Sequence, residues 1–181
     1  MRSLLILTLA TNGFTLVCIL SEGPTSRSMR LTATSGDSLE LEVLGYQFPE
    51  LETADYDSNW LRIRITASLA GRGWTTTDPS LLTYEAAELA AWLKDLGSGA
   101  PYQVKMSFIE PNLAFEVVED SSDGRRLRVY LELEARPPWA RADGAPAEDL
   151  WLEFPVASEM LIAAAGSLQD QCERYPPRAH V

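Results

Sequence analysis

The chain has 181 residues with 26 acidic and 15 basic side chains, so its formal net charge is −11; the length fits one domain, and 46 % apolar residues suffice for a core. This acidic balance excludes a general DNA- or RNA-binding protein, because phosphate contacts need clustered Lys and Arg. One histidine, His180, and two cysteines, Cys18 and Cys172, disfavour a positioned histidine base, a zinc site and a disulfide framework.

The first 28 residues pose a separate question. Residues 1–20 carry one Arg followed by a mostly apolar run, which is typical of a secretory signal peptide. The run is interrupted at residues 11–13, lacks an A-x-A-like cleavage site and is marginal for a membrane span. Three interpretations stand: a cleaved signal, a retained anchor, or a natural translation start at Met29. We therefore divide the chain into a segment 1–28, a single domain 29–175 and a Pro-rich tail 176–181.

Alternating apolar and charged residues predict strands in the first half of the domain. Residues 38–48 and 59–69 alternate with period two, the mark of a half-buried strand. Residues 74–82 predict a weaker strand or loop that is broken at Pro79.

The period then changes to that of a helix. Thr83 is expected to cap a helix that stops at Gly97, and a last helix begins at Ser158 and ends at Pro176-Pro177. The apolar stripe of the first helix has helical spacing and is expected to be core: Leu89, Trp92, Leu93 and Leu96.

Four further strands are predicted, over residues 102–108, 112–118, 126–135 and 149–156. Turn residues separate them, as expected for an antiparallel meander. The sequence thus predicts an α+β fold: a mostly antiparallel twisted sheet of about six strands, with two helices packed on one face.

The outward face of that sheet follows from alternation, and it is rich in charge. Its expected members are Glu40, Glu42, Arg62, Arg64, Glu116, Arg128, Tyr130, Glu132 and Glu134. One interpretation is a solvated face with Arg–Glu cross-strand pairs. The other is a carboxylate-rich surface that receives a basic partner, with Trp60 and Trp139 near its edges.

Catalytic and metal-binding patterns are weak. Asp55, Asp57 and Asn59 match the first ligand positions of a calcium loop, but Trp60 and Thr66 occupy positions that need Gly and Glu. Glu132 and Glu134 are an acid–base pair only by spacing, and such pairs are common on surface strands. Ser and Cys nucleophiles lack a histidine partner, and no phosphate-binding Gly-rich loop occurs. We expect no enzyme activity, no metal and no cofactor.

An ordered series of short motifs is more specific than these patterns. It comprises Gly45-Tyr46-Gln47-Phe48-Pro49, Asp57-Ser58-Asn59-Trp60-Leu61, Trp74, Asp78-Pro79, Leu82-Thr83-Tyr84-Glu85, Phe108-Ile109-Glu110-Pro111-Asn112-Leu113, Leu131-Glu132-Leu133-Glu134 and Arg136-Pro137-Pro138-Trp139. Over residues 30–156 the series resembles the WapI-type immunity proteins, bacterial antidotes to contact-delivered toxins.

The resemblance implies a non-catalytic, cytoplasmic protein that binds and neutralises a cognate toxin domain, which in the type member cleaves transfer RNA. An acidic inhibitor would be steered electrostatically onto a basic nuclease. We expect no direct contact with nucleic acid or membrane. The alternative, which rests on residues 1–20, is a secreted or envelope-anchored acidic binding domain. The candidate partner-binding residues are Asp55, Asp57, Trp60, Glu110, Glu132, Glu134 and Trp139.

Overall fold

A computed structural model describes residues 7–11, 14–18, 28–51, 56–121, 124–141 and 150–178 of the chain. Near the N-terminus, β1 (Leu7–Thr11) pairs antiparallel with β2 (Phe14–Cys18). The choice among signal peptide, anchor and later start for residues 1–28 stays a prediction. Among the described residues, none of the helices combines the length and the apolar character needed to cross a bilayer.

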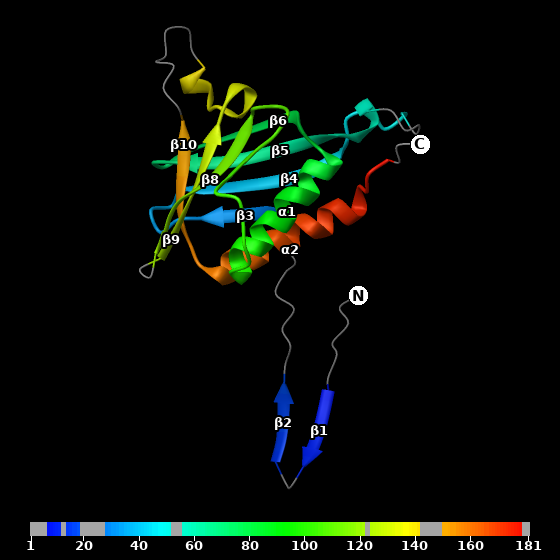
Figure 1. Ribbon diagram of the computed structural model, residues 1–181, viewed down its shortest axis with the longest axis vertical. Coiled ribbons are helices and arrows are strands. Elements are labelled where there is room, and N and C mark those ends of the chain that lie inside the picture. The colour runs from blue at the N-terminus through cyan, green and yellow to red at the C-terminus, as the bar shows by residue number, and fades with distance from the viewer. Residues whose placement is uncertain are drawn as a thin grey trace.

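Two antiparallel sheets of four strands form the rest of the β structure (Figure 1). The first has the order β3-β4-β5-β6, with β3 at Met29–Thr32, β4 at Ser38–Tyr46, β5 at Trp60–Leu69 and β6 at Arg72–Leu82. The second has the order β10-β9-β8-β7, with β7 at Lys105–Ser107, β8 at Leu113–Ser121, β9 at Gly124–Leu131 and β10 at Trp151–Val156. The α+β class is confirmed, but the expectation of one sheet of about six strands is wrong.

A single shared core explains why the strands divide into two sheets. Leu39, Leu41 and Ile63 of the first sheet are fully buried in the same apolar cluster as Phe115 and Val129 of the second. Two sheets whose inner faces meet, with helices closing the remaining sides, bury more apolar surface than one sheet with a bare outer face. The alternation of the sequence therefore gives the correct inward residues, although not the sheet to which each strand belongs.

The strand expected over residues 126–135 is wrong at its end. β9 stops at Leu131, and the next residues turn into a short 3-10 helix, η2 (Leu133–Ala135). Leu133 has a φ of 46°, which lies far from extended backbone. The Leu-Glu-Leu-Glu alternation has the period of a strand, but the backbone after Leu131 is no longer part of the sheet.

The two helices lie side by side (Figure 1): α1 spans Thr83–Ser98 and α2 spans Ser158–Arg174. The N-cap of α1 is Leu82 rather than Thr83, and the Glu85 carboxylate accepts the Leu82 N–H at 2.9 Å. Gly97 is not the stop, because the helix ends at Gly99, whose φ of 74° suits a left-handed cap. A Cβ on Gly97 would lie 3.0 Å from the side chains of Leu161 and Ile162, so this glycine instead allows α2 to approach.

A buried glutamine joins α2 to the first sheet. Strand β3 pairs with β4 only as far as Leu41, so the Val43 N–H on that edge needs another acceptor. The fully buried Gln171 supplies it: its Oε1 accepts the Val43 N–H at 2.7 Å, and its Nε2 donates to the Leu41 carbonyl at 3.5 Å. The side chain thus replaces one missing residue of the ladder.

Replacing this glutamine tests its structural role. Gln171→Leu keeps the burial but leaves the Val43 N–H without an acceptor, so we expect the free energy of unfolding to fall by about 1–3 kcal/mol. Urea denaturation measures the change. Gln169→Leu on the exposed face of the same helix is the matched control and should change stability by less than about 0.5 kcal/mol. Equal effects of both variants would contradict the assignment.

Candidate functional site

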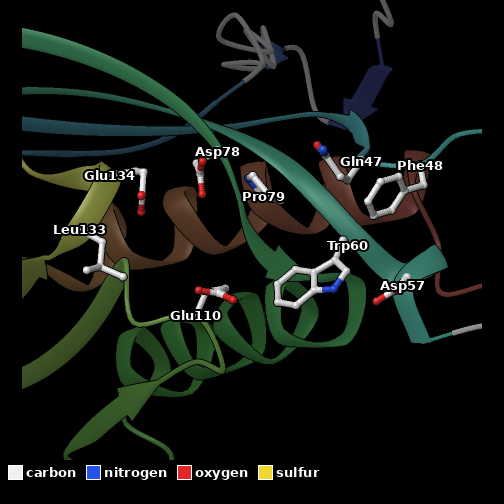
Figure 2. A pocket seen from close by; sticks show the side chains of 9 residues that line it. All are labelled: Gln47, Phe48, Asp57, Trp60, Asp78, Pro79, Glu110, Leu133 and Glu134. Atoms are coloured by element: carbon white, nitrogen blue, oxygen red, sulfur yellow. The ribbon is translucent and has the colours of Figure 1, made fainter.

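An open pocket of about 470 Å³ lies where the ends of several elements meet, and we call it the acidic cleft (Figure 2). Its lining combines four carboxylates with aromatic and apolar side chains. The lining residues are Gln47, Phe48, Asp57, Trp60, Asp78, Pro79, Glu110, Leu133 and Glu134. Glu110, Leu133 and Glu134 face Phe48 and Asp57 across the cleft, with Asp78 and Pro79 between them (Figure 2).

Four of the seven predicted partner-binding residues come together in this cleft: Asp57, Trp60, Glu110 and Glu134. Glu132 lies instead in a second pocket of about 370 Å³, with Lys105 and Tyr130. Trp139, in the short 3-10 helix η3 (Pro138–Ala140), packs edge-on against Trp74 with ring centroids 5.5 Å apart. Asp55 lies outside the described residues.

The first wall is formed by the exit from β4 and the entry to β5. The Gln47 N–H donates to the Trp60 carbonyl at 2.8 Å, which places Phe48 beside Trp60. Asp57 stands one turn earlier, in the 3-10 helix η1 (Tyr56–Asn59). The Trp60 ring meets Tyr56 edge-on, with centroids 6.2 Å apart. An aromatic pair therefore stabilises this wall.

A β-bulge in the edge strand β6 lies next to Asp78 and Pro79 of the cleft. In the pairing of β5 with β6, Arg62 faces Pro79 and Leu61 faces Leu81, so Ser80 is the extra residue. Bulges bend a strand and change the direction of its side chains, and proline is tolerated there because the ladder is already interrupted. The break expected at Pro79 is wrong, because β6 continues through this residue to Leu82, and Pro79 lines the cleft.

The opposite wall depends on a buried carboxylate at the start of α1. Glu85 is 5 % exposed, and its second oxygen accepts the Ile109 N–H at 2.8 Å. This bond fixes the turn that carries Glu110. The Glu132 N–H donates to the Asn112 carbonyl at 3.0 Å, so the segment leading to Leu133 and Glu134 is fastened to the same turn.

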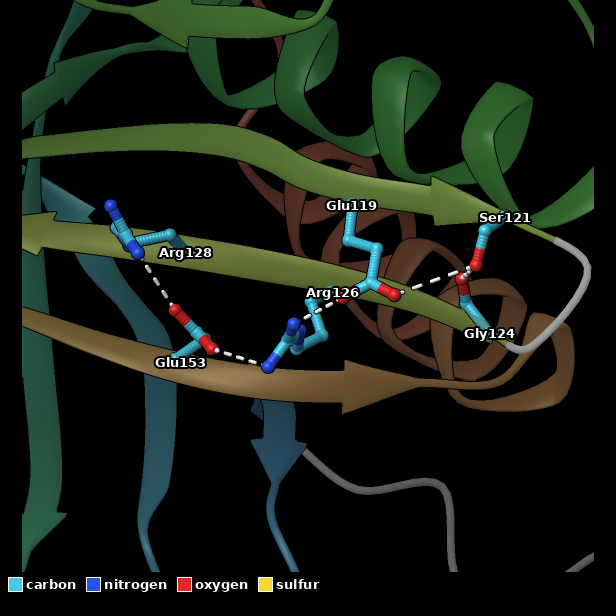
Figure 3. A network of polar contacts seen from close by, with 6 residues as sticks. All are labelled: Glu119, Ser121, Gly124, Arg126, Arg128 and Glu153. Carbon is cyan, nitrogen blue, oxygen red and sulfur yellow. Dashed lines mark hydrogen bonds and ion pairs between the residues drawn. The ribbon is translucent and has the colours of Figure 1, made fainter.

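The carboxylates of the cleft differ from those of the sheets. On the sheets, Glu42 pairs with Arg64 at 2.9 Å, and Glu153 bridges Arg126 and Arg128 at 3.3 and 2.9 Å (Figure 3). Across the described part of the chain, none of the four cleft carboxylates forms an ion pair: Asp57, Asp78, Glu110 and Glu134. The four carboxylates therefore leave an unneutralised negative charge in the cleft.

The pKa of the Asp78 carboxyl is raised within the cleft. Its partial burial raises the pKa of its carboxyl above 3.8, and the neighbouring Glu134 charge raises it further. A hydrogen bond from Asn112 Nδ2 at 3.3 Å acts in the opposite direction. The raised pKa means that the charged form is held at some free-energy cost in the absence of a cation.

Exposed apolar side chains surround the acids. Leu133, which lines the cleft, is 52 % exposed, while Ile109, next to Glu110 in the chain, and Tyr56, in ring contact with Trp60, are 56 % and 43 % exposed. Leu133 also holds the positive φ noted above, a conformation that a leucine rarely adopts. Backbone strain and exposed apolar surface at one place are typical of a binding site.

The carboxylates do not form a metal site. Among the described residues, no group of three or more His, Cys, Asp or Glu side chains is arranged to hold a metal ion. The acids stand instead around the rim of an aromatic-lined opening, an arrangement that can receive cationic side chains.

A family comparison gives this geometry a context. The model of the immunity protein WapI-like family matches residues 30–176. The chain belongs to this family. The resemblance expected over residues 30–156 is thereby confirmed, and the match extends through α2. No curated protein matches the chain. Every residue that lines the acidic cleft falls within the immunity-family match.

Sequence reasoning did not propose Gln47, Phe48, Asp78 or Leu133 as lining residues of this immunity-family domain. Phe48 belongs to the motif series without a predicted binding role, and Leu133 falls in the strand expected over residues 126–135. Asp78 is adjacent to Pro79 in a predicted strand, and a proline beside an acid inside a strand signals a bulge. That signal predicts an irregular strand next to Asp78, although not the cleft that it lines.

The raised pKa of Asp78 predicts the effect of removing its charge. At pH 7, Asp78→Asn should raise the melting temperature, because the native state no longer holds the crowded charge. The advantage should disappear as the pH falls through the raised native pKa towards 3.8, since wild-type Asp78 then becomes neutral. Thermal unfolding at pH 3–8 measures both the higher melting temperature at pH 7 and its loss at low pH.

Asp120 is the matched control with the opposite sign. Hydrogen bonds from Arg125 and Tyr102 lower the pKa of its carboxyl. Asp120→Asn should therefore lower the melting temperature at pH 7, and this deficit should vanish as the pH falls below 3.8 and then through the lowered native pKa. The same sign for both variants would refute the electrostatic explanation.

Proposed function

We propose that this member of the immunity family neutralises a cognate toxin domain by binding it at the acidic cleft, inside the cell and without catalysis. The observation that carries the proposal is the set of unpaired carboxylates around Trp60. The family supplies the immunity role, and the cleft supplies a surface on which a protein partner can bind.

The proposed partner surface is basic. Unpaired carboxylates in a concave, partly apolar site create a negative potential that attracts cations and accelerates encounter. A nuclease carries Lys and Arg for its substrate phosphates, so its substrate-binding face has the required charge. The sheet carboxylates contribute less to such attraction, because arginines such as Arg64 and Arg128 already neutralise them.

The apolar rim supplies the remaining contact. Half-buried Trp60 on one wall and exposed Leu133 on the other, with carboxylates between them, have the composition of an interface centre, in which aromatic anchors are surrounded by polar groups. An arginine or lysine of the toxin could lie over Trp60 while its charge meets Asp57, Asp78 or Glu110. The cleft thus suits a protruding basic loop of a folded partner.

Co-expression tests the function directly. A candidate toxin domain from the genome neighbourhood of this gene is induced in cells with and without this protein, and growth is followed. We expect growth only when this protein is present, and we expect the two proteins to copurify. Equal killing in both cultures would end the proposal.

Charge reversal tests the cleft. Glu110→Lys and Glu134→Lys should each weaken the affinity for the toxin domain by about 10–100-fold, mainly through slower association at low salt. Asp170→Lys makes the same change in net charge at an exposed position on α2 and should leave the affinity within about threefold of wild type. Surface plasmon resonance at several salt concentrations measures both rate constants. A loss of affinity that is equal for Asp170→Lys would assign the effect to net charge rather than to the cleft.

A further inference from the structure

The chain after α2 turns back against the exit from β4. Tyr175 packs edge-on against Tyr46 with ring centroids 5.7 Å apart, and the Tyr175 hydroxyl donates to the Leu44 carbonyl at 3.4 Å. The Tyr46 hydroxyl donates to the Pro176 carbonyl at 2.6 Å. We call residues 175–178 the C-terminal strap. It lies along the loop that carries Gln47 and Phe48 of the cleft.

Arg178, in the strap, holds this loop through backbone acceptors. Its guanidinium donates to the carbonyls of Phe48 at 2.9 Å and Pro49 at 3.1 Å, and also to that of Leu51. Its Cζ lies 3.7 Å from the centroid of the Tyr46 ring. A planar fork with several donors can serve three carbonyls at once, whereas a lysine ammonium on a flexible stem serves them less well.

The same residue also reaches the second segment of that wall. The Arg178 N–H donates to Asn59 Oδ1 at 2.9 Å, and Asn59 Nδ2 donates to the Arg178 carbonyl at 3.3 Å. Asn59 is 1 % exposed and immediately precedes Trp60. Its Oδ1 accepts in addition the Thr83 hydroxyl at 2.9 Å, which connects the wall to the start of α1.

We propose that Arg178 is a positioning residue for the acidic cleft: it ties the Phe48 loop to the Asn59–Trp60 turn and so sets the shape of the wall that receives the partner. The binding consequence rests on the proposed function, but the ordering of the wall does not. Arg178 does not line the cleft, so it acts through Phe48 and Trp60 rather than by touching the partner.

A matched pair of variants separates this role from a change in charge. Arg178→Ala removes the three carbonyl contacts, and Arg174→Ala removes the same charge from an exposed position at the end of α2. Arg178→Lys keeps the charge beside Tyr46 and should rescue only partly. Hydrogen exchange of the amides of residues 47, 48, 50, 51 and 60 is measured without any toxin, and affinity for the toxin domain identified by co-expression is measured separately.

We expect Arg178→Ala to accelerate exchange in the Phe48 loop and to weaken toxin affinity, each by about tenfold or more, with the core amides of β5 unchanged. Arg174→Ala should behave as wild type. Wild-type exchange rates in Arg178→Ala, or equal effects of both alanine variants, would overturn the proposal. Faster exchange with unchanged affinity would also overturn it, since the wall would then not position the partner.

The two proposals can fail separately. If wild-type protein does not bind the toxin domain, the proposed function fails, while faster exchange in Arg178→Ala still supports the ordering of the wall. If Arg178→Ala unfolds, shown by exchange of β5 amides, Arg178→Lys replaces it: this change keeps the charge beside Tyr46 and loses the planar fork that serves the three carbonyls. It should accelerate exchange of the amides of residues 47, 48, 50 and 51, and unchanged exchange there would overturn the proposal.

Discussion

The buried carboxylate of Glu85 is the interaction on which the arrangement of the cleft depends. One oxygen accepts the Leu82 N–H at the start of α1, and the other accepts the Ile109 N–H in the turn before β8. A helix N-terminus favours a carboxylate there because its amides are unpaired and its dipole is positive. Glu85 therefore caps the helix and, with the same charge, fastens the turn that carries Glu110. The helix that packs against the core thereby also places one wall of the surface.

The net charge is not evenly neutralised, because among the described residues ion pairs form on the sheets and not in the cleft. A charge of −11 is a property of the whole sequence, but the sheets neutralise much of their acid with arginines such as Arg64, Arg126 and Arg128. Exposed pairs of this kind contribute little stability, although they keep like charges from meeting across the strands. The four cleft carboxylates, which form no such pairs with other described residues, add a local negative potential at the cleft. Electrostatic steering of a partner depends on such a local potential more than on total charge.

The sequence predicts the buried side of each strand because alternation depends only on the pleat. Leu39, Ile63 and Leu93 are fully buried as expected. It does not predict how the strands divide between two sheets, because that division depends on contacts between distant residues.

The error at Leu133 has a different cause. The residue fits the alternation of a strand, but its positive φ is incompatible with extended backbone. Asp57, Trp60, Glu110 and Glu134 were chosen as acids and aromatics in motifs, and they meet in one cleft because loops from both sheets end there.

Most of the domain has unstrained backbone and satisfied polar groups, whereas the cleft contains several locally unfavourable features. Leu133 is strained and exposed, Asp78 holds its charge against a raised pKa, and a β-bulge distorts β6 next to Pro79. Elsewhere, a similar break is repaired within the chain: Gln171 satisfies the unpaired Val43 N–H, and arginines satisfy the sheet carboxylates. A cationic, partly apolar partner would relieve the cleft in the same way, by pairing the carboxylates and covering Leu133. The free energy gained by pairing these carboxylates and covering Leu133 is available only in the complex. The same features that destabilise the isolated domain would therefore stabilise its complex.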